Sequence, residues 1–560
     1  MIGINQAHYV GLYTSSFVKG SMTPQIYFEW EIGSPNVLPD PTMKGDINYN
    51  HRTQQVNVAA LEFAINYFVN RHDTFRSIVR QDGQMEVYST RDVPWYTITH
   101  VNSSVGAADP EAVLKATRKD MTTNGPKVFV WPLFESRVTH TSPTSSVVHF
   151  TVSLFLMDAM SDLILRHELS VLYRAYLNSS FNSSGAERIL KSSPAGAPPI
   201  YKLFDECQQL SSKPKILFTD YCTALEGKLR CSRDYLAAKE FWSKRMFTLP
   251  AGPELPMLLS PVAGQENNTG RFSNFHRWLT VDEWRRTKAN CAKYAVTIPA
   301  MLLAIYAIVL SHWSNKDVSE CFSFCLLCVV YLPPYSLLIP FHLLYCAVFV
   351  SLQHFLINVL QCLRHPVHED VHRIVGNCSS TILCEVDFRT ATGKSISFVE
   401  AVKRIARELS RNLQYACMSG IEVMQELNRL RGKTFSAVAP FIFTTPIGVE
   451  NGNAEISERD WIFNETFFSE RVPHTACVNA IKADPSGTAC ASLDIIDGVF
   501  ADEVTKGVHS SYNTMLDLIC SKNASDWSKP IEFAIPEPAS CPPISPPDDV
   551  RGKPNLLLHE

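Results

Sequence analysis

VVHFTVSLFLMDAMSDLILRHELSVLYRAYL, residues 147–177, decides the fold of this 560-residue chain. Its first part, up to Asp158, is a nearly continuous apolar run rich in β-branched and aromatic residues, which predicts a buried strand. From Ser161 onward, apolar residues recur at helical spacing, which predicts an amphipathic helix. A buried strand that leads through a carboxylate into a helix indicates a mixed fold, in which helices cover sheets.

Strands and helices alternate on both sides of this stretch. Residues 25–31 (QIYFEWE) and 439–445 (APFIFTT) predict strands, and residues 77–89 predict a hairpin around Asp82-Gly83. Further helices are predicted at 57–70, 235–247, 296–314, 397–416, 421–432 and 501–520. Because no glycine-rich phosphate loop accompanies them, we expect an α/β or α+β fold without a nucleotide site.

Composition excludes several classes of function. Hydrophobic residues make up 46% of the chain and charged residues 19%, and the formal net charge is -4. This balance gives no basic surface for nucleic acid and no polybasic patch for a membrane. The 16 cysteines are unevenly spaced and follow no signal peptide, so we expect reduced thiols in a cytoplasmic protein.

One segment differs from the rest of the chain. Residues 318–353 hold a single charged residue, Glu320, and are long enough to span a bilayer. Three prolines and the absence of a strongly basic flank argue against a membrane span. Val318-Ser319-Glu320 and Gln353 can be encoded by the usual ends of an intron, so we hypothesise a translated, unspliced intron. Mature messages that always retain the segment would contradict this.

Five motifs occur in an order typical of one family. They are RHDTFRSIV (71–79), PAGPELPML (250–258), FLINVLQCLRHPVHEDVHRIVGNCSS (355–380), SGIEVMQEL (419–427) and APFIFTTPIG (439–448). Together they resemble the condensation domains of nonribosomal peptide synthetases, in the heterocyclization subfamily. An opening motif, QAHYVGLYTSSFVKG (6–20), resembles QxAYWxGR of the subfamily, but Leu12 stands in place of its final Arg. The resemblance covers about residues 5 to 530.

The resemblance implies an α+β fold, with two chloramphenicol-acetyltransferase-like lobes in a V-shaped pseudodimer around a central tunnel. We expect the first lobe at 1–215 and the second at 216–530, with 318–353 as an insertion. Residues 531–560 are expected to form a proline-rich linker toward an adenylation domain that the chain does not contain. Arg76 and Asn358, which lie in two of the motifs, are expected to support the tunnel.

The resemblance also identifies candidate site residues near Asp158. Ordinary condensation domains carry HHxxxDG and heterocyclization domains carry DxxxxDxxS, whereas the aligned stretch here is SLFLMDAMS (153–161). Asp158 and Ser161 match the second pattern, Ser153 replaces its first Asp, and Leu154 replaces the proton-handling His of the first pattern. Asp158 is a catalytic candidate, but a helix-capping, structural role is favoured for it, and Ser153 and Ser161 are expected at the tunnel.

Thr444 is the second catalytic candidate. It matches the Thr of the PVVFTS motif, on which ring closure depends in the family. The Asp partner of that Thr falls near Val478, with Asn479 beside it, and valine cannot act as a base. Asn377 likewise stands where the family has an acidic residue. Thr444 could equally be a β-branched residue that fills a buried strand.

His368-Glu369-Asp370-Val371-His372 fits the HExxH zinc motif. Pro366 and the absence of a long amphipathic helix argue against zinc, so we expect no metal. The cysteines lack a context that would lower their pKa, which argues against thiol catalysis.

The expected function is condensation or heterocyclization of carrier-bound aminoacyl thioesters in secondary-metabolite biosynthesis, with reduced or lost activity given the substituted polar residues. Expected partners are carrier proteins, which supply phosphopantetheine so that the chain needs no cofactor of its own, and adenylation domains. Two alternatives remain open. One is a non-catalytic scaffold that docks carriers and derives from a truncated synthetase. The other is a membrane-anchored acyltransferase that uses 318–353 as its anchor.

Overall fold

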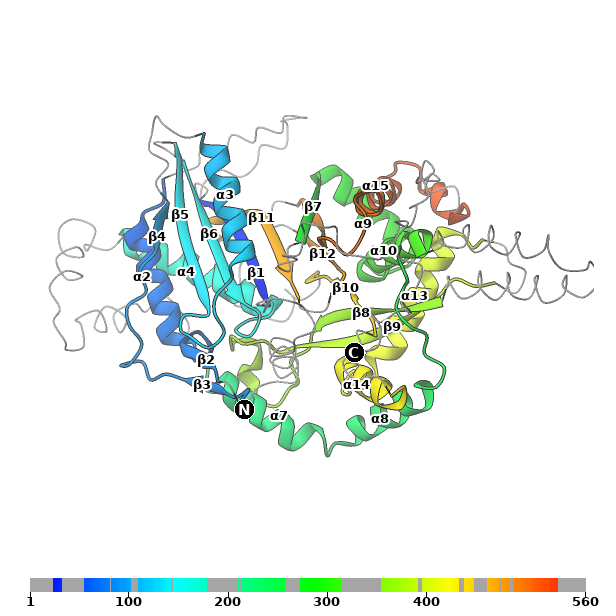
Figure 1. The fold of residues 1–560 in the computed structure, drawn as a ribbon, viewed down its shortest axis with the longest axis horizontal. Coiled ribbons are helices and arrows are strands. Elements are labelled where there is room, and N and C mark those ends of the chain that lie inside the picture. The colour runs from blue at the N-terminus through cyan, green and yellow to red at the C-terminus, as the bar shows by residue number, and fades with distance from the viewer. Residues whose placement is uncertain are drawn as a thin grey trace, which may run out of the picture.

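The computed structural model describes residues 24–32, 55–80, 82–101, 109–142, 145–178, 210, 213–256, 272–314, 354–390, 395–432, 438–447, 461–472, 475–483 and 487–531. These residues form two lobes side by side, each built from a sheet and covering helices (Figure 1). This arrangement confirms the expected α+β fold. The opening motif, the apolar segment 318–353 and the proline-rich tail lie outside the described residues.

The first lobe contains a sheet with the strand order β11-β1-β6-β5-β4. Phe28, Trp30 and Phe150 on one face belong to a buried apolar cluster shared with two helices that pack together, α2 and α4. Glu29 lies between Phe28 and Trp30 on β1, so its side chain points to the opposite face of the sheet. There it pairs with Arg118 of helix α3. The elements are β1 (Gln25–Ile32), α2 (Val58–Arg71), β4 (Thr99–Val101), α3 (Pro110–Thr123), β5 (Phe134–Ser142), β6 (Ser145–Ser153), α4 (Ala159–Asn178) and β11 (Phe463–Arg471).

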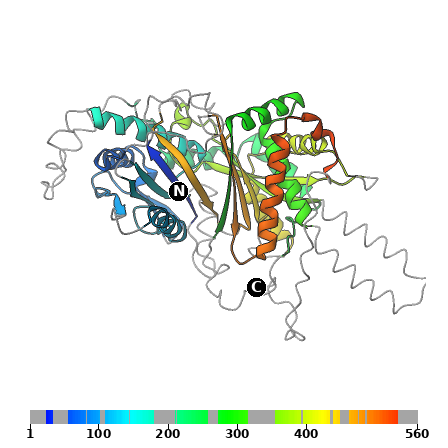
Figure 2. The same ribbon diagram turned by 90° about the horizontal axis from the view of Figure 1, so that it is seen from above.

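The second lobe contains a sheet with the strand order β7-β13-β12-β10-β8-β9. Figure 2 shows helices on the side of this sheet that faces away from the first lobe, and one large buried cluster joins them to it. The strands are β7 (Phe272–Leu279), β8 (His354–Cys362), β9 (Ser379–Asp387), β10 (Phe441–Thr444), β12 (Cys477–Ala483) and β13 (Ala489–Ile496). The helices of this half are α7 (Phe218–Leu229), α8 (Arg233–Arg245), α9 (Val281–Lys293), α10 (Ile298–Ser314), α13 (Phe398–Leu413), α14 (Gly420–Leu430) and α15 (Asp502–Ile519).

Strand β11 crosses between the lobes. It lies in the chain between β10 and β12 of the second sheet, yet it pairs antiparallel with β1 in the first, with Tyr27 opposite Ser469. Figure 2 shows it beside β1. A division of the chain at residue 215 therefore assigns β11 to the second lobe, whereas its hydrogen bonds belong to the first sheet.

Three hydrogen bonds then hold β11 to the second lobe. The Asn274 amide nitrogen donates to the Ser469 hydroxyl at 2.9 Å. His276 Nε2 lies 2.6 Å from the carbonyl oxygen of Phe468. The backbone amide of Glu470 donates to the Asp494 carboxylate at 2.7 Å. Side chains of β7 and β13 therefore bond to consecutive residues of β11, which connects the two sheets.

The local predictions hold in part. β2 (Ser77–Val79) and β3 (Met85–Val87) form the predicted hairpin, with Gly83 in its turn at φ 79°. Strand β6 ends at Ser153, however, whereas the strand was predicted to run to Asp158. Residues 154–157 form a buried apolar turn instead. Periodicity cannot separate such a turn from a buried strand, because both are continuous apolar runs.

The length and hydropathy of the described helices can be compared with those of a membrane-spanning helix. Among them, no single helix is both long and apolar enough to cross a bilayer. Only α9 and α10 taken together reach that length, and a bend of 100° separates them.

Candidate functional site

Asp158 directly precedes α4, and its carboxylate is completely buried. Oδ1 accepts hydrogen bonds from the amide and the hydroxyl of Ser161 at 2.8 and 2.7 Å. A bond from the side chain to the amide three residues onward is the geometry of a helix N-cap. Oδ2 accepts from the amide of Cys378, in the second lobe, at 3.1 Å. Asp158 thus caps its own helix and also holds the backbone of the other lobe.

The charge of Asp158 is balanced by Arg364, which follows β8. Their side chains are 0% and 2% exposed, and Arg364 Nη2 lies 2.8 Å from Asp158 Oδ1. Nη1 donates to the carbonyl oxygens of Val371 and Ile374 at 2.8 and 2.6 Å. Burial alone would lower the pKa of Arg364, but the adjacent Asp158 carboxylate raises it above its ordinary value. Arg364 therefore keeps its charge and forms a buried ion pair with Asp158 between the lobes.

Ser161 completes this junction. Its hydroxyl oxygen lies 3.0 Å from both the amide nitrogen and the carbonyl oxygen of Gly376 in the second lobe. Arg364 Nη2 also reaches that oxygen, at 3.2 Å. Asp158, Ser161 and Arg364 thus fasten the start of α4 to the chain that leads into β9, and we call these three residues the interlobe junction.

A cavity lies beside the interlobe junction, with about 1070 Å³ of empty space including its mouth. Its wall from the first lobe comes from β1, the turn after β6, the start of α4 and β11. Its wall from the second lobe comes from β8, β10 and β12. Asp158 and Thr444, the two catalytic candidates of the sequence, both line it.

Thr444 is the last residue of β10 and is half-buried, with Ala480 of β12 opposite it in the sheet. No described residue hydrogen-bonds to its hydroxyl, whereas the neighbouring Thr445 hydroxyl donates to the carbonyl oxygen of Ile481 at 2.8 Å. A hydroxyl beside a cavity that has no partner among the described residues can bond a ligand. Thr444 is thus placed for a direct contact, which Asp158 is not.

The family's catalytic Asp aligns near Val478 and Asn479, and neither of these side chains can act as a base. Val478 is 1% exposed and belongs to the apolar core of the first lobe. The side chain of Asn479 points to the other face of the sheet, where its nitrogen donates to the Ser492 carbonyl and the Tyr512 hydroxyl, both at 2.9 Å. Any acid-base group for this cavity must therefore come from another position.

The other predicted residues do not line the cavity. Arg76 donates to the carbonyl oxygens of Val69 and Asn70 at 3.0 and 2.6 Å, so it caps the C-terminus of α2. Ser153 is fully buried, and its hydroxyl donates to Pro24 O at 3.2 Å. Asn358 lies within β8, and its side-chain oxygen is buried without a hydrogen bond from any described residue. Of the predicted residues, Asp158 and Thr444 line the cavity, and Ser161 lies behind Asp158, to which it is hydrogen-bonded.

Charged residues that the motifs did not indicate form one wall of the cavity. Arg166 pairs with Asp162 at 2.6 Å within α4 and stacks on Trp461, 4.5 Å from its ring centre. Lys482 of β12 lies 3.4 Å from the Glu465 carboxylate and over the Phe468 ring. The sequence signal for such residues is weak. It consists of charged residues placed inside otherwise apolar strands and helices, a pattern that structural ion pairs share.

Glu470 of β11 lines the same wall, and it is 7% exposed. No described residue donates a hydrogen bond to its carboxyl group. Burial raises the pKa of Glu470 to about 7, the Lys482 ammonium opposes that rise, and the Asp494 carboxylate adds to it. Burial also raises the pKa of Asp494, although Asn274 and Ser492 donate hydrogen bonds to it.

Metal and thiol chemistry find no support in the described part of the chain. It contains no group of three His, Cys, Asp or Glu side chains placed to hold a metal ion. The HExxH segment is a 3-10 turn, Glu369–His372, in which His368 Nδ1 accepts from the Asp370 amide. Cys362 lines the cavity, but burial raises the pKa of its thiol to about 12, so it remains protonated.

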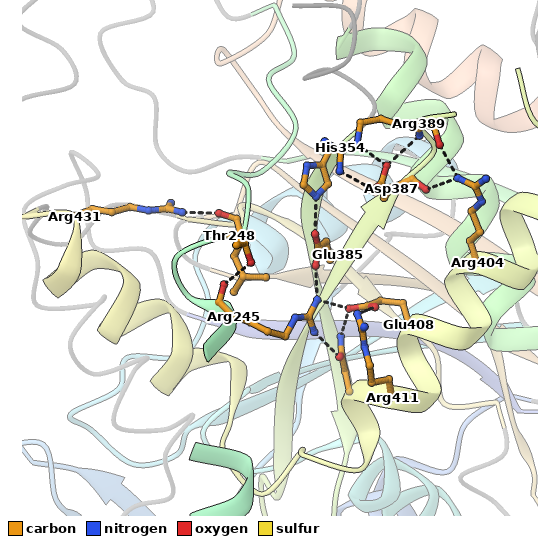
Figure 3. Close-up of polar contacts among 12 residues, drawn as sticks. Arg245, Thr248, His354, Glu385, Asp387, Arg389, Arg404, Glu408, Arg411 and Arg431 are labelled. Carbon is orange, nitrogen blue, oxygen red and sulfur yellow. Dashed lines mark hydrogen bonds and ion pairs between the residues drawn. The ribbon is translucent and has the colours of Figure 1, made fainter. Parts of the chain in front are cut away.

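Figure 3 shows a second charged cluster around β9. None of its labelled residues is among those that line the cavity. Arg245 from the end of α8 bonds to both Glu385 and Glu408, and donates to Asn412 Oδ1 at 2.8 Å. His354 Nε2 lies 2.6 Å from the other Glu385 oxygen. Because these bonds join α8, β8, β9 and α13, the cluster stabilises the lobe.

Comparisons with known proteins agree with this architecture, although no family model matches the chain. Pyochelin synthetase PchF of Pseudomonas aeruginosa is 23% identical over 391 residues, which cover 70% of this chain and 17% of that protein. Phenyloxazoline synthase MbtB of a Mycobacterium species is 25% identical over 211 residues, 38% of this chain and 14% of that protein. The chain thus spans less than a fifth of these relatives.

A solved structure extends the likeness over nearly the whole chain. The EpoB NRPS cyclization-docking bidomain from Sorangium cellulosum superposes with a TM-score of 0.65 at 19% identity, covering 93% of this chain and 85% of that one. The expected fold is therefore confirmed.

Proposed function

We propose that this chain, a condensation/cyclization-type domain of the nonribosomal peptide synthetase family, joins two carrier-bound aminoacyl groups. It would then close a ring on the product. The single observation that carries this proposal is one cavity between two lobes, lined by Thr444, whose hydroxyl has no hydrogen-bond partner among the described residues. A site that holds two tethered groups together gains several kcal/mol from proximity alone. The name of one relative, a phenyloxazoline synthase, supports the ring-forming step.

Amide formation would depend mainly on placement. The acceptor amine attacks the donor thioester carbon, the C–N bond forms, and the thiol of the donor arm leaves. Leu154 stands on the cavity wall where condensation domains have the proton-handling His, so no side chain at that position moves the proton. The amine would instead enter uncharged and lose its proton to water. Slow but detectable amide formation is the expected consequence.

Thr444 would serve the ring closure. In that step the Cys, Ser or Thr side chain of the new residue attacks the amide carbon, and water leaves. A hydroxyl that can both donate and accept suits an oxygen whose charge and protonation change during the reaction. Asp158 would act only indirectly, since its oxygens are occupied by Ser161, Arg364 and Cys378. We assign it the role of holding the walls of the cavity in register.

The proposed partners follow from the chemistry of the substrates. Aminoacyl thioesters would be delivered on the phosphopantetheine arms of two carrier proteins and loaded by adenylation domains. The structure of a cyclization-docking bidomain is the comparison that supports such carrier partners. We regard the arms as part of the substrates, and the chain would need no bound cofactor of its own.

The proposal is tested by a reaction between two loaded carriers. One carrier bears an aminoacyl donor and the other bears cysteine. The products are released from the carrier, and their masses are measured by mass spectrometry. The expected products are the linear amide and a ring product lighter by one water. Binding of both carriers without either product would support a docking scaffold instead. A reaction without the chain gives the uncatalysed background.

A further inference from the structure

Glu470 combines three properties that no other carboxyl on the cavity wall shares. It is more than nine-tenths buried, it lines the cavity, and no described residue bonds to its side chain. Asp158 lines the same cavity but accepts bonds from Ser161, Arg364 and Cys378. Asp162 is paired with Arg166 at 2.6 Å. Buried carboxyl groups normally have partners, so an unpartnered one at a cavity points to a ligand.

The fold holds Glu470 at this place from both lobes. Its backbone is paired in the first sheet, opposite Ile26 of β1. Its amide donates to Asp494 of the second sheet at 2.7 Å. The adjacent Ser469 and Phe468 are also bonded to β7. A carboxyl on a strand fixed at three consecutive residues keeps its position while substrates enter, as an acid-base group must.

Lys482 links Glu470 to the Thr444 side of the cavity. Thr444 lies opposite Ala480 on β12, and Lys482 lies two residues further on that strand, with its side chain on the same face. The positive charge of Lys482 acts on Glu470. Ala480 and Lys482 both line the cavity, so Thr444, Lys482 and Glu470 occupy one continuous surface.

We propose that Glu470 is the acid-base group of ring closure in this cavity and replaces the carboxylate that is absent at Val478. This inference rests on the proposed function. Asp494, directly opposite Val478 on β13, is not the group, because it does not line the cavity and its oxygens accept bonds from Asn274, Ser492 and the Glu470 amide. Glu470 is the nearest carboxyl along the chain that reaches the cavity.

The proposed step balances without any further reactant. The ionised Glu470 accepts the proton of the substrate thiol or hydroxyl as its sulfur or oxygen bonds to the amide carbon. The C=O π bond opens at the same time, and the carbonyl oxygen takes a proton from solvent water and becomes a hydroxyl. The protonated Glu470 then gives that proton to the hydroxyl as the C–O bond breaks and water leaves. Loss of the amide proton to solvent forms the C=N bond. A carboxyl that titrates about pH 7 is suited to both transfers at neutral pH.

The test measures the ratio of ring product to linear amide in the two-carrier reaction for the wild type, Glu470→Gln and Glu86→Gln. Glu86 is an exposed residue of β3, 47% accessible, and provides the same chemical change away from the cavity. For Glu470→Gln the ratio is expected to fall at least about tenfold, and for Glu86→Gln it should stay at the wild-type value. Circular dichroism establishes that both variants are folded.

The outcomes separate this inference from the function on which it rests. Ring formation by Glu470→Gln at the wild-type ratio would overturn the role of Glu470 and leave the proposed function intact. A wild-type chain that forms neither product would overturn both. If Glu470→Gln does not fold, the pH dependence of the wild type decides. Its ratio of ring product to linear amide, plotted against pH, should change slope at about pH 7. A ratio that stays constant from pH 5.5 to 8.5 would refute the assignment. The charged groups around Glu470 are Lys482, Asp494 and, behind Asp494, His276.

Discussion

Asp158 of the first lobe and Arg364 of the second form an ion pair at 2.8 Å, and almost no part of either side chain is exposed. Asp158 also lines the cavity between the lobes. It also caps α4 through its bonds to Ser161. A single carboxylate therefore holds the start of that helix, the chain that leads into β9 and this part of the cavity wall. The predictions below follow from this arrangement and from the charged wall that faces it.

Replacing Asp158 by Ala should destabilise the chain by about 3–5 kcal/mol, because it leaves the Arg364 charge buried without its partner. Urea unfolding monitored by tryptophan fluorescence measures the change. Asp234→Ala, on the exposed surface of α8, provides the control and should change the midpoint far less. A loss for Asp158→Ala as small as that of the control would show that the pair does not hold the lobes.

Thr444→Val should remove most of the ring product, with little effect on stability. The change keeps the β-branched shape and removes a hydroxyl that has no partner among the described residues, so no buried group loses a hydrogen bond. The yield of ring product is expected to fall about 10- to 100-fold. Thr223→Val on the exposed face of α7 is the matched control. Undiminished ring yield in Thr444→Val would assign Thr444 to packing alone.

The raised pKa of Glu470 predicts a pH-dependent stability. A carboxyl with a pKa of about 7 in the folded chain and about 4.5 in the unfolded chain binds its proton more tightly when folded. Stability from this group is therefore present below pH 4.5 and lost as the pH rises to 7, by about 3 kcal/mol in all. The difference in unfolding free energy between the wild type and Glu470→Gln isolates this group. A difference that stays constant from pH 4.5 to 7 would show that Glu470 titrates normally.

Arg245→Met should weaken the second lobe without affecting the ratio of ring product to amide. The change leaves Glu385 and Glu408 near each other without the shared guanidinium that Figure 3 shows between them. We expect a loss of about 2 kcal/mol in urea unfolding. Lys244→Met, in an exposed pair one residue earlier, should leave the midpoint unchanged. An altered product ratio in folded Arg245→Met would mean that this cluster communicates with the cavity.

Much of the fold could be predicted from the sequence because its signals are local. The hairpin at Asp82-Gly83 and the amphipathic helices depend on turn residues and on spacing within a few positions. The place of β11 could not be predicted in this way, since a strand pairs in either sheet with the same alternation. The buried turn at 154–157 was missed for a related reason, because its residues are as apolar as those of the strand before it.

The site residues also differ in whether the sequence alone could predict them. Asp158, Ser161 and Thr444 fall in recognisable motifs, and in the structure Asp158 and Thr444 line the cavity while Ser161 is hydrogen-bonded to Asp158. Glu470 falls in no motif, and its character comes from burial and from Asp494 and Lys482, which lie 24 and 12 residues away in the chain. A perturbed carboxyl of this kind depends on tertiary contacts, which a single sequence does not display.

The most direct test of the central claim is the mass spectrum of the two-carrier reaction with the wild-type chain, one carrier bearing an aminoacyl group and the other bearing cysteine. A cavity that receives both arms and supplies Thr444 and Glu470 predicts a product one water lighter than the linear amide, in excess of the reaction without the chain. A spectrum in which both carriers return with their original loads would contradict the claim.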